Sequence, residues 1–355
     1  MKRIAVLKWS FDNIGGGEKV AINLSNELSN LYKVTLISFN SSKELFYPLK
    51  DRVEYINLGF GRKRVRNGFI SNTIKLVRTI KKLKINLIIS VGSPTISFMI
   101  IASLFSLFNI KTIYAEQSNP SRNDLGKLHL FQQYLAVKYA DKIVTLTSQG
   151  KKIYTENYSI NPDKIEVIHN WIDNIHYNFK YDSKCKKLVT VGRFHPEKGY
   201  NFVVDIAKKI YEKYPDWYWD IYGDGDEEIM TDLSNMPNIK LKGIVKGIEN
   251  IFPNHSIYVM TSYYEGLPLV LLEAKQFSLP IVSFDCPTGP SEIIRNNENG
   301  FLIDNYNVDL MFEKISLLIE DRNKRIQFSN NASLDIDKFS KPTIIKQWLD
   351  LIDSL

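Results

Sequence analysis

Residues 261–294 read TSYYEGLPLVLLEAKQFSLPIVSFDCPTGPSEII and decide the fold of this chain. The apolar residues 257–260 before them predict a short buried strand, and residues 280–284 predict a second one. Between the two strands, Pro268 is well placed to open a helix, because its missing N–H and its fixed φ suit the first helical position. The stretch therefore predicts a strand, a helix and a strand in succession, the repeating unit of a parallel sheet.

Two glutamates of this unit are candidates for ligand binding. Glu265 lies in the loop before the predicted helix. Glu273 lies about one and a half turns inside it, roughly 7–8 Å further along the axis. A carboxylate can accept two hydrogen bonds from a vicinal diol, and a helix N-terminus favours anions, so a sugar nucleotide would suit this arrangement. Two isolated glutamates are more often a loop charge and a solvated helix residue, and the residues around them decide between these interpretations.

The segment EGLPLVLLEA, from Glu265 to Ala274, resembles the motif of the retaining glycosyltransferases of family 4, which have the GT-B fold. That motif has two glutamates separated by seven residues. The resemblance covers nearly the whole chain and is strongest over residues 185–305. It implies that Glu273 holds the ribose of the donor and that Glu265 contacts the hydroxyls of the donor sugar. It also implies sugar contacts from the N–H groups of Leu267 and its neighbour Gly266.

Length and composition are those of a globular protein with two domains. The 355 residues are 44% hydrophobic and 24% charged, which is enough for a sizeable core. The two cysteines, Cys185 and Cys286, form neither a disulfide framework nor a metal-binding pattern, which favours a reducing compartment. The N-terminus is too briefly apolar for a signal peptide, and no apolar run reaches the ~18 residues of a membrane span. Residues 95–108 come closest and are expected to form a buried or interface-facing helix.

The net charge of +7 is unevenly distributed along the chain. Residues 55–115 contain no Asp or Glu, and their basic residues are Arg62, Lys63, Arg64, Arg66, Lys75, Arg78, Lys81, Lys82, Lys84 and Lys111. Such a segment suits an anionic membrane surface, while a solvated helix face and a nucleic-acid site are the alternatives. Because no nucleic-acid-binding motif is present, we expect no nucleic acid as partner and predict that segment 62–84 contacts the membrane.

The start of the chain predicts a strand at residues 4–8, a glycine-rich loop and a helix at residues 19–31. Glycines between a strand and a helix allow backbone N–H groups to approach a phosphate. The loop is a weak dinucleotide fingerprint, because the third glycine is missing and the next strand ends at Asn40 instead of an acid. By the resemblance, Gly16 and Gly17 lie beside the donor diphosphate. The alternative is a tight turn without a ligand.

Buried apolar runs in the rest of the first half predict strands at residues 33–39, 53–58, 86–91, 111–115, 142–146 and 164–169. Strands that alternate with helices imply a doubly wound parallel sheet, whose ligands lie at the carboxyl ends of the strands. We expect Glu116 and Gln117 there, on the acceptor or sugar side, with a strand-capping loop as the alternative. Many family members have a functional histidine near this position, whereas here His129 lies further along the chain.

The second half repeats the alternation after a linker at residues 173–184, with strands at residues 187–191, 217–222 and 239–242. The segment GRFHPEKG follows the first of these strands. Arg193 offers a planar fork of donors and Lys198 a compact charge, and both suit a diphosphate that gains charge as the sugar leaves. The resemblance gives both residues this role. It also lays Ile244 against the nucleotide base.

Other motifs of the second half have less weight. Asp224 and Asp226 form an Asp-x-Asp pair in a glycine-rich turn, and we interpret the pair as part of the turn and predict no metal site. Residues 285–294 resemble a form common among bacterial transferases that use UDP-galactose, UDP-N-acetylgalactosamine or related donors. Cys286 has no base beside it and is expected to be inert. Residues 299–303 match a turn of the family, and Trp348 in a final helix at 343–352 is expected to anchor that helix to the first domain.

Together these observations predict an α/β protein of the GT-B fold. Its parts are an acceptor-side domain at residues 1–172, a nucleotide-sugar-binding domain at 185–338, and a helix within 339–355 that returns to the first domain. The expected activity is retaining, metal-independent transfer of a hexose from a UDP-sugar to a lipid-linked or envelope glycan, as in lipopolysaccharide or O-antigen synthesis. No cofactor is expected, and the protein is expected at the cytoplasmic face of the plasma membrane. The alternatives are a sugar-nucleotide epimerase, a phosphorylase and a non-catalytic sugar-nucleotide-binding subunit.

Overall fold

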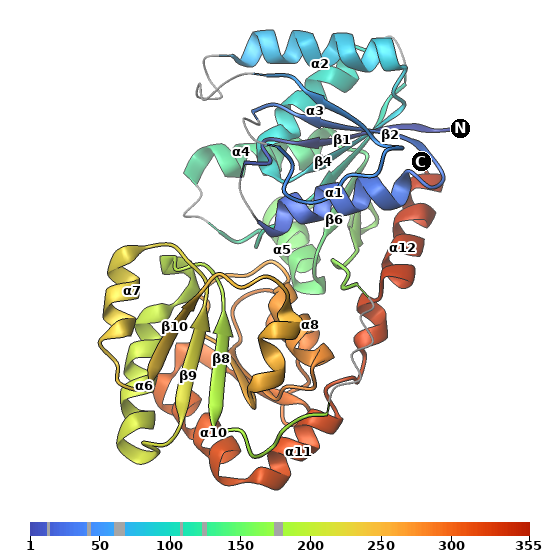
Figure 1. Cartoon of the computed structure of the whole chain (residues 1–355). Coiled ribbons are helices and arrows are strands. Elements are labelled where there is room, and N and C mark those ends of the chain that lie inside the picture. Colours follow the sequence, from blue (N-terminus) through green and yellow to red (C-terminus); the bar gives the residue numbers. More distant parts are fainter. Residues whose placement is uncertain (13–14, 41–43, 60–67, 107–108, 123–125, 174–179) are drawn as a thin grey trace. The chain divides into compact units, whose positions relative to one another are not determined.

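The computed structural model describes residues 1–12, 15–40, 44–59, 68–106, 109–122, 126–173 and 180–355 (Figure 1). The chain divides into two compact units. The first unit contains Met1–Asn170 and Ile344–Leu355, and the second contains Trp171–Thr343. Both units are α/β, and every strand pair in both sheets is parallel, which confirms the predicted fold class.

The first unit is built on a seven-stranded sheet with the order β3-β2-β1-β4-β5-β6-β7. Strand β1, an interior strand of this sheet, has four consecutive fully buried apolar residues, as expected for a parallel strand covered by helices on both faces. Ile4 of β1 lies opposite Val34 on one side and Leu87 on the other. The strands are β1 (Arg3–Lys8), β2 (Lys33–Ser38), β3 (Glu54–Asn57), β4 (Leu87–Val91), β5 (Lys111–Ala115), β6 (Lys142–Thr145) and β7 (Ile165–Val167).

Helices pack on this sheet and complete the core of the first unit. Helix α3 contacts both α2 and α4, so these three helices form one layer (Figure 1). The helices are α1 (Gly16–Leu28), α2 (Phe69–Leu83), α3 (Ile96–Leu104), α4 (Gly126–Tyr139) and α5 (Ser148–Tyr158), with the short 3-10 helices η2 (Ser93–Thr95) and η3 (Pro162–Lys164). The last helix, α12 (Lys341–Asp353), belongs to this unit from Ile344 onward.

The second unit has a six-stranded sheet with the order β10-β9-β8-β11-β12-β13 and its own apolar core. Its strands are β8 (Lys187–Val191), β9 (Tyr218–Tyr222), β10 (Ile239–Gly243), β11 (Ile257–Met260), β12 (Ile281–Phe284) and β13 (Gly300–Ile303). Its helices are α6 (Tyr200–Lys213), α7 (Glu227–Ser234), α8 (Leu269–Gln276), α9 (Pro290–Ile293), α10 (Val308–Glu320) and α11 (Arg322–Asn330). The 3-10 helices among the described residues of this unit are η4 (Pro196–Lys198), η5 (Ile248–Asn250), η6 (Phe252–Asn254), η7 (Asp304–Tyr306) and η8 (Ile336–Phe339).

The strand orders fix where each unit can bind a ligand. The order reverses between β1 and β4 in the first sheet and between β8 and β11 in the second. Ligands of open α/β sheets bind outside the carboxyl ends of the strands at such a reversal. The loops after these four strands are therefore the candidate ligand loops.

Some local predictions differ from the structure. Helix α1 begins at Gly16, three residues earlier than predicted, so two of the three glycines form its first turn. Residues 300–303 form strand β13 where a turn was expected, because Phe301 and Ile303 are buried and the segment pairs with β12. Pro268 precedes helix α8 as its N-cap and is not its first residue.

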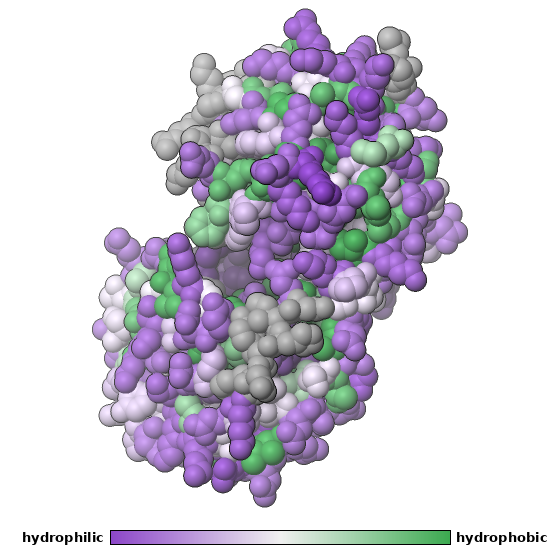
Figure 2. All heavy atoms as spheres, turned by 45° about the vertical axis from the view of Figure 1, so that its right-hand side comes forward, coloured by the Kyte–Doolittle hydropathy of each residue, from purple (hydrophilic) through white to green (hydrophobic). Residues whose placement is uncertain are grey.

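Two further features bear on the predicted relation to the membrane. No helix among the described residues has the length and apolar character needed to cross a membrane. The face of the molecule drawn in Figure 2 is mainly hydrophilic.

Candidate functional site

The second unit brings the loops after β8 and β11 into direct contact. Gly199 ends η4 with a φ of +65°, and a Cβ atom at this position would lie 2.1 Å from the Thr261 carbonyl oxygen. Only glycine permits both the conformation and the approach. Thr261 Oγ1 also donates a hydrogen bond of 2.9 Å to the Lys198 carbonyl. The two loops are therefore joined by a close backbone contact and by a hydrogen bond.

Within these loops, Lys198 and Glu265 form an ion pair. Lys198 Nζ lies 2.7 Å from Glu265 Oε1, and the two side chains are 23% and 12% exposed. Ser262 Oγ donates to the same oxygen at 2.7 Å, and Thr288 Oγ1 donates to the Glu265 carbonyl. The carboxylate is thus fixed next to a positive charge at the point where the strand order reverses, an arrangement that suits a polar, anionic ligand.

Glu273 lies on α8, one turn beyond the start of the helix. Its charge and that of Glu265 both affect the pKa of Tyr258. The hydroxyl of Tyr258 has a raised pKa, first because the side chain is fully buried and also because both carboxylates repel the phenolate. The charges of the two glutamates predicted as a pair therefore act on the same buried tyrosine.

The loop after β12 closes on the segment between the two glutamates. Gly289 has a φ of +103°, and its Cβ position would lie 2.9 Å from the Gly266 carbonyl and 2.5 Å from Pro268 Cδ. Leu267 is buried beside this contact. Gly266 and Leu267 are consequently held by their neighbours and are preorganised for a backbone contact.

Arg193 and Ile244 lie in more open surroundings. The Arg193 side chain is 68% exposed, and its Nη2 lies 3.4 Å from Glu197 Oε1, which is a loose ion pair. Ile244 follows β10 and is 73% exposed. An exposed apolar side chain at a carboxyl edge is available to pack on a planar ring, and an exposed guanidinium is available to a phosphate.

The Asp-x-Asp segment has local structural roles. Asp226 caps α7 by accepting hydrogen bonds from the backbone N–H groups of Glu228 and Ile229, at 3.0 and 3.2 Å. Asp224 accepts from the N–H of Gly225 at 2.9 Å. Among the described residues, no group of three or more His, Cys, Asp or Glu side chains could hold a metal ion.

In the first unit, Gly16 and Gly17 open helix α1 beside an ion pair that the sequence did not reveal. Lys8 Nζ lies 3.4 Å from Glu18 Oε1, and both side chains are mostly buried. A Cβ on Gly17 would lie 2.6 Å from Lys8 Nζ, whereas a Cβ on Gly16 would have nothing within 4 Å. The absence of a side chain at Gly17 therefore leaves space for the Lys8 side chain. The position of Lys8 just before the glycine-rich loop is the only sequence signal for this ion pair.

Glu116 points into the first unit, with only 1% of its surface exposed. Its carboxylate accepts hydrogen bonds from two tyrosine hydroxyls, a glutamine amide, a serine hydroxyl and two backbone N–H groups. The donors are Tyr114, Tyr154, Gln133, Ser118 and the N–H groups of Gln117 and Ser118. This geometry does not favour the predicted substrate contact of Glu116. It favours the alternative, in which Glu116 shapes the loop after β5.

Gln117 and His129 lie at the same edge of the first unit. Gln117 is half-buried, and its Oε1 accepts from Asn170 Nδ2 at 3.4 Å. His129 on α4 is buried, and its Nδ1 lies 3.0 Å from the Ser93 hydroxyl in the turn after β4. Folding thus brings His129 to a loop at the reversal of strand order, although it is 36 residues away in the sequence. Sequence spacing alone could not show this.

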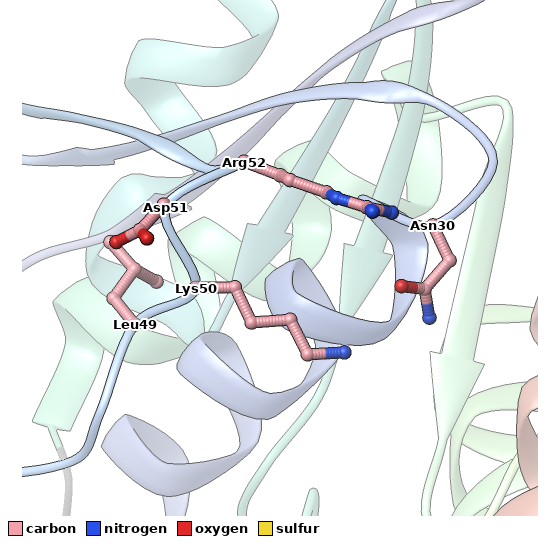
Figure 3. A pocket seen from close by; sticks show the side chains of 5 residues that line it. All are labelled: Asn30, Leu49, Lys50, Asp51 and Arg52. Carbon is pink, nitrogen blue, oxygen red and sulfur yellow. The ribbon is translucent and has the colours of Figure 1, made fainter.

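A pocket elsewhere in the first unit is large but does not match these loops. It has a volume of about 530 Å³ and is lined by Asn30, Leu49, Lys50, Asp51 and Arg52 (Figure 3). The side chains of Lys50 and Arg52 both extend toward the side of the pocket where Asn30 lies. Asn30 precedes β2 and residues 49–52 precede β3, so this pocket is at the amino ends of the strands, opposite the expected ligand edge.

Family models match both halves of the chain. Residues 14–174 match the family described as Glycosyltransferase Family 4, and residues 172–335 match the one described as Glycosyl transferases group 1.

Curated relatives of the same length carry this type of name. An uncharacterized glycosyltransferase of Haemophilus influenzae is 30% identical and aligns over 99% of this chain and 100% of its own length. The amylovoran biosynthesis glycosyltransferase AmsD of Erwinia amylovora is 28% identical over the same shares. A Campylobacter jejuni N-acetylgalactosaminyltransferase, named for an acceptor on diNAcBac-PP-undecaprenol, is 25% identical over 96% of this chain and 95% of its own.

Solved structures share the fold at lower sequence identity. The crystal structure of Anabaena Alr3699/HepE in complex with UDP-glucose superimposes with a TM-score of 0.83 at 18% identity, over 100% of both chains.

Proposed function

Because this chain belongs to the family 4 type of GT-B glycosyltransferases, we propose that it moves a hexose from a UDP-sugar to a lipid-linked or envelope glycan with retention of configuration. Glycosyltransferase activity in polysaccharide synthesis follows from the family. The hexose is of the galactose, N-acetylgalactosamine or glucose type.

The observation that carries the donor assignment is the Lys198–Glu265 pair at the reversal between β8 and β11. A leaving nucleoside diphosphate gains negative charge as the glycosidic bond breaks. Lys198 is held in place to stabilise that charge, and Arg193 can swing onto it. Since these cations and the helix N-termini supply the positive charge, we propose that transfer does not depend on a metal ion.

The family resemblance supports the remaining proposed donor contacts. Glu273 would accept hydrogen bonds from the ribose diol, and Ile244 would pack on the base. Glu265 would bind a sugar hydroxyl through an oxygen beyond its bond with Lys198, next to the backbone of Gly266 and Leu267. In the first unit, Gly16 and Gly17 would approach the diphosphate with their N–H groups. Gln117 remains a proposed acceptor-side contact.

The acceptor assignment is supported by charge and by the names of relatives. The Campylobacter jejuni relative is named for an acceptor on diNAcBac-PP-undecaprenol, and the Erwinia amylovora relative for amylovoran biosynthesis. Segment 62–84 is strongly basic, although Arg62, Lys63, Arg64 and Arg66 lie outside the described residues. We propose that this segment binds the anionic inner face of the plasma membrane and that the acceptor reaches the enzyme there.

Calorimetric titration with UDP in excess EDTA tests the donor site. We expect the wild type to bind UDP without metal. Glu273→Ala should weaken UDP binding by about tenfold or more, since it removes a bidentate, charged contact. Glu212→Ala, which alters an exposed glutamate of α6, is the matched control and should bind like the wild type. If folded wild type does not bind UDP, GDP and ADP are tested next, and loss of all three overturns the donor class.

Transfer assays test the chemistry. With a panel of UDP-sugars and a lipid-linked glycan acceptor, Glu265→Gln should lower kcat/KM by about a hundredfold or more. NMR of the product should show the anomeric configuration of the donor. Inverted configuration would exclude the retaining mechanism. Epimerised donor, phosphate-dependent cleavage, or UDP binding without turnover would each replace transfer by one of the alternative functions.

A further inference from the structure

We propose that a groove between α2 and α3 of the first unit holds the apolar chain of an anionic lipid, so that the protein docks by insertion as well as by charge. This inference rests on the proposed membrane-bound acceptor and deepens it.

The sequence of α2 places an apolar stripe on its outer surface. Asn72, Leu76 and Ile80 are the buried residues of the helix and face the core. Ile70, Ile74 and Val77 follow one another at i, i+4 and i+7, which is one apolar stripe on a helix, and Lys81 continues the same line at i+11. Ile70 and Ile74 of this stripe are 75% and 45% exposed, so the stripe forms part of an exposed apolar surface.

The groove lies where this stripe meets α3. It has a volume of about 390 Å³, and Ile74, Val77, Ile101 and Phe105 give it an apolar lining. Arg78 and Lys81 also line it and bring two positive charges to its border. Leu104 and Phe105, at the end of α3, are 66% and 68% exposed. An apolar floor bordered by cations matches a molecule that has a hydrocarbon chain and an anionic head group.

Charge selects an anionic lipid over other occupants. Residues 55–115 contain no acidic residue at all. Within the described ranges neither Arg78 nor Lys81 forms an ion pair. A second copy of this chain would present the same positive face and would be repelled. Nucleic acid would gain little from the isoleucine and leucine side chains, whereas a bilayer buries them and neutralises the cations.

The neighbouring helix α4 exposes side chains of the same kinds. Helix α4 packs against α3 and exposes Leu128, Phe131 and Tyr134 together with Lys127 and Lys138. Its first turn has no acidic residue. All three helices therefore expose apolar side chains, and α2 and α4 also expose basic ones, which are the residue types of interfacial membrane-binding surfaces.

Vesicle sedimentation with full-length protein tests the proposal. At low salt, we expect binding to vesicles that contain phosphatidylglycerol and none to pure phosphatidylcholine. Arg78→Gln with Lys81→Gln should weaken this binding by about tenfold. Ile74→Ser with Phe105→Ser should also weaken it by about tenfold or more. The matched control is Leu31→Ser, since Leu31 is an exposed apolar residue of the same unit that follows α1.

Salt separates insertion from simple attraction. Bound wild type should partly resist high salt, which screens surface charges, while the Ile74→Ser/Phe105→Ser protein should dissociate completely. If the wild type dissociates as completely as that variant, attraction alone accounts for docking and the groove is not a lipid site.

A probe at the groove gives a direct reading. Phe105→Cys can be labelled with a polarity-sensitive fluorophore in a Cys185→Ser background, because Cys286 is buried. Vesicles with phosphatidylglycerol should shift its emission to the blue, and the same label at Leu31→Cys should not respond. An unshifted spectrum from vesicle-bound protein overturns the proposal. UDP binding by each variant reports on the donor site separately, so a failed groove and a failed donor assignment give different results.

Discussion

Glu265 and Glu116 are both largely buried carboxylates, yet their hydrogen bonds give them different capacities. Glu265 Oε1 is held by Lys198 and Ser262. Glu116 accepts from six donors distributed over both of its oxygens. A carboxylate has about four acceptor positions, so Glu116 has none left for a substrate. We infer that Glu265 binds the donor, whereas Glu116 stabilises the loop after β5.

Glu116→Gln is therefore expected to change stability and not donor affinity. Either orientation of the amide would turn an N–H group toward a hydrogen-bond donor, and we expect the free energy of unfolding to fall by roughly 2–4 kcal/mol. Denaturant unfolding measures this, and UDP calorimetry should give an unchanged Kd. Tyr154→Phe, which removes one of the six bonds, should lower the free energy by about 1 kcal/mol. A fully stable Glu116→Gln protein that has lost transfer would return Glu116 to the substrate site.

Sequence reasoning was least informative for such single residues. The motifs around Arg193, Lys198, Glu265 and Glu273 made these residues candidates. They did not predict the ion pair between Lys198 and Glu265. The direction of the Glu116 side chain depends on two tyrosines, one of which is 38 residues away in the sequence. Side-chain direction in a loop is set by such distant partners, and local pattern carries no information about them.

At the scale of elements, helix α8 connects the proposed donor site to the body of the second unit. Two residues beyond Glu273, the buried Lys275 donates hydrogen bonds to the carbonyls of Ile293 and Leu334, at 2.9 and 3.0 Å. Burial lowers the pKa of Lys275 to about 8, with a further contribution from the positive charge of Lys338. The two hydrogen bonds of the Lys275 ammonium group therefore fix helix α8, while the burial of its positive charge lowers the stability of the folded state.

This lowered pKa predicts a pH-dependent stability. Between about pH 8 and pH 10, the unfolded lysine remains protonated while the folded one is not, so the unfolded state binds more protons and stability rises with pH. Below about pH 8 the lysine is protonated in both the folded and the unfolded state, so the full free-energy cost of burying its charge remains. We expect the free energy of unfolding to rise by about 1–3 kcal/mol over this window and the rise to disappear in Lys275→Met. Lys208→Met, on an exposed face of α6, should keep the wild-type slope, and a flat wild-type curve would contradict the assignment.

Most strands could be predicted because parallel strands buried on both faces are short continuous apolar runs. β5, β8 and β11 coincide with their predicted ranges. Edge strands and the boundaries of helices were harder to predict. β13 is a four-residue edge strand that starts with glycine, and α1 incorporates glycines that read as a loop. In both cases tertiary contacts outweigh local preference.

At the scale of the molecule, the chain forms two units and returns to the first one at its end. Helix α12 contributes the buried residues Ile344, Trp348 and Ile352 to that unit. Lys2 donates to the Ile352 carbonyl, and Tyr32 donates to Asp353 at 2.8 Å. The final helix therefore closes the first unit by contacts with its beginning.

Trp348→Ala should consequently destabilise the first unit in particular. Truncating a large buried aromatic side chain costs about 3–5 kcal/mol, because a cavity remains. We expect a lower thermal midpoint for the first unit, followed through the fluorescence of a label placed there, while the UDP-dependent stabilisation of the second unit persists. Gln347→Ala, at an exposed neighbouring position, serves as control. An unchanged midpoint would mean that α12 does not support the first unit.

The hydroxyl groups around Glu116 also provide a natural reporter. Tyr114 and Tyr154 are fully buried, and their O–H groups lie 2.6 and 3.0 Å from the carboxylate. Phenolic protons in water exchange too fast to give separate NMR resonances, whereas protons held in this way exchange only when the surrounding structure opens. Two downfield proton signals would thus record, without any label, how often the interior of the first unit is exposed to solvent while the enzyme works.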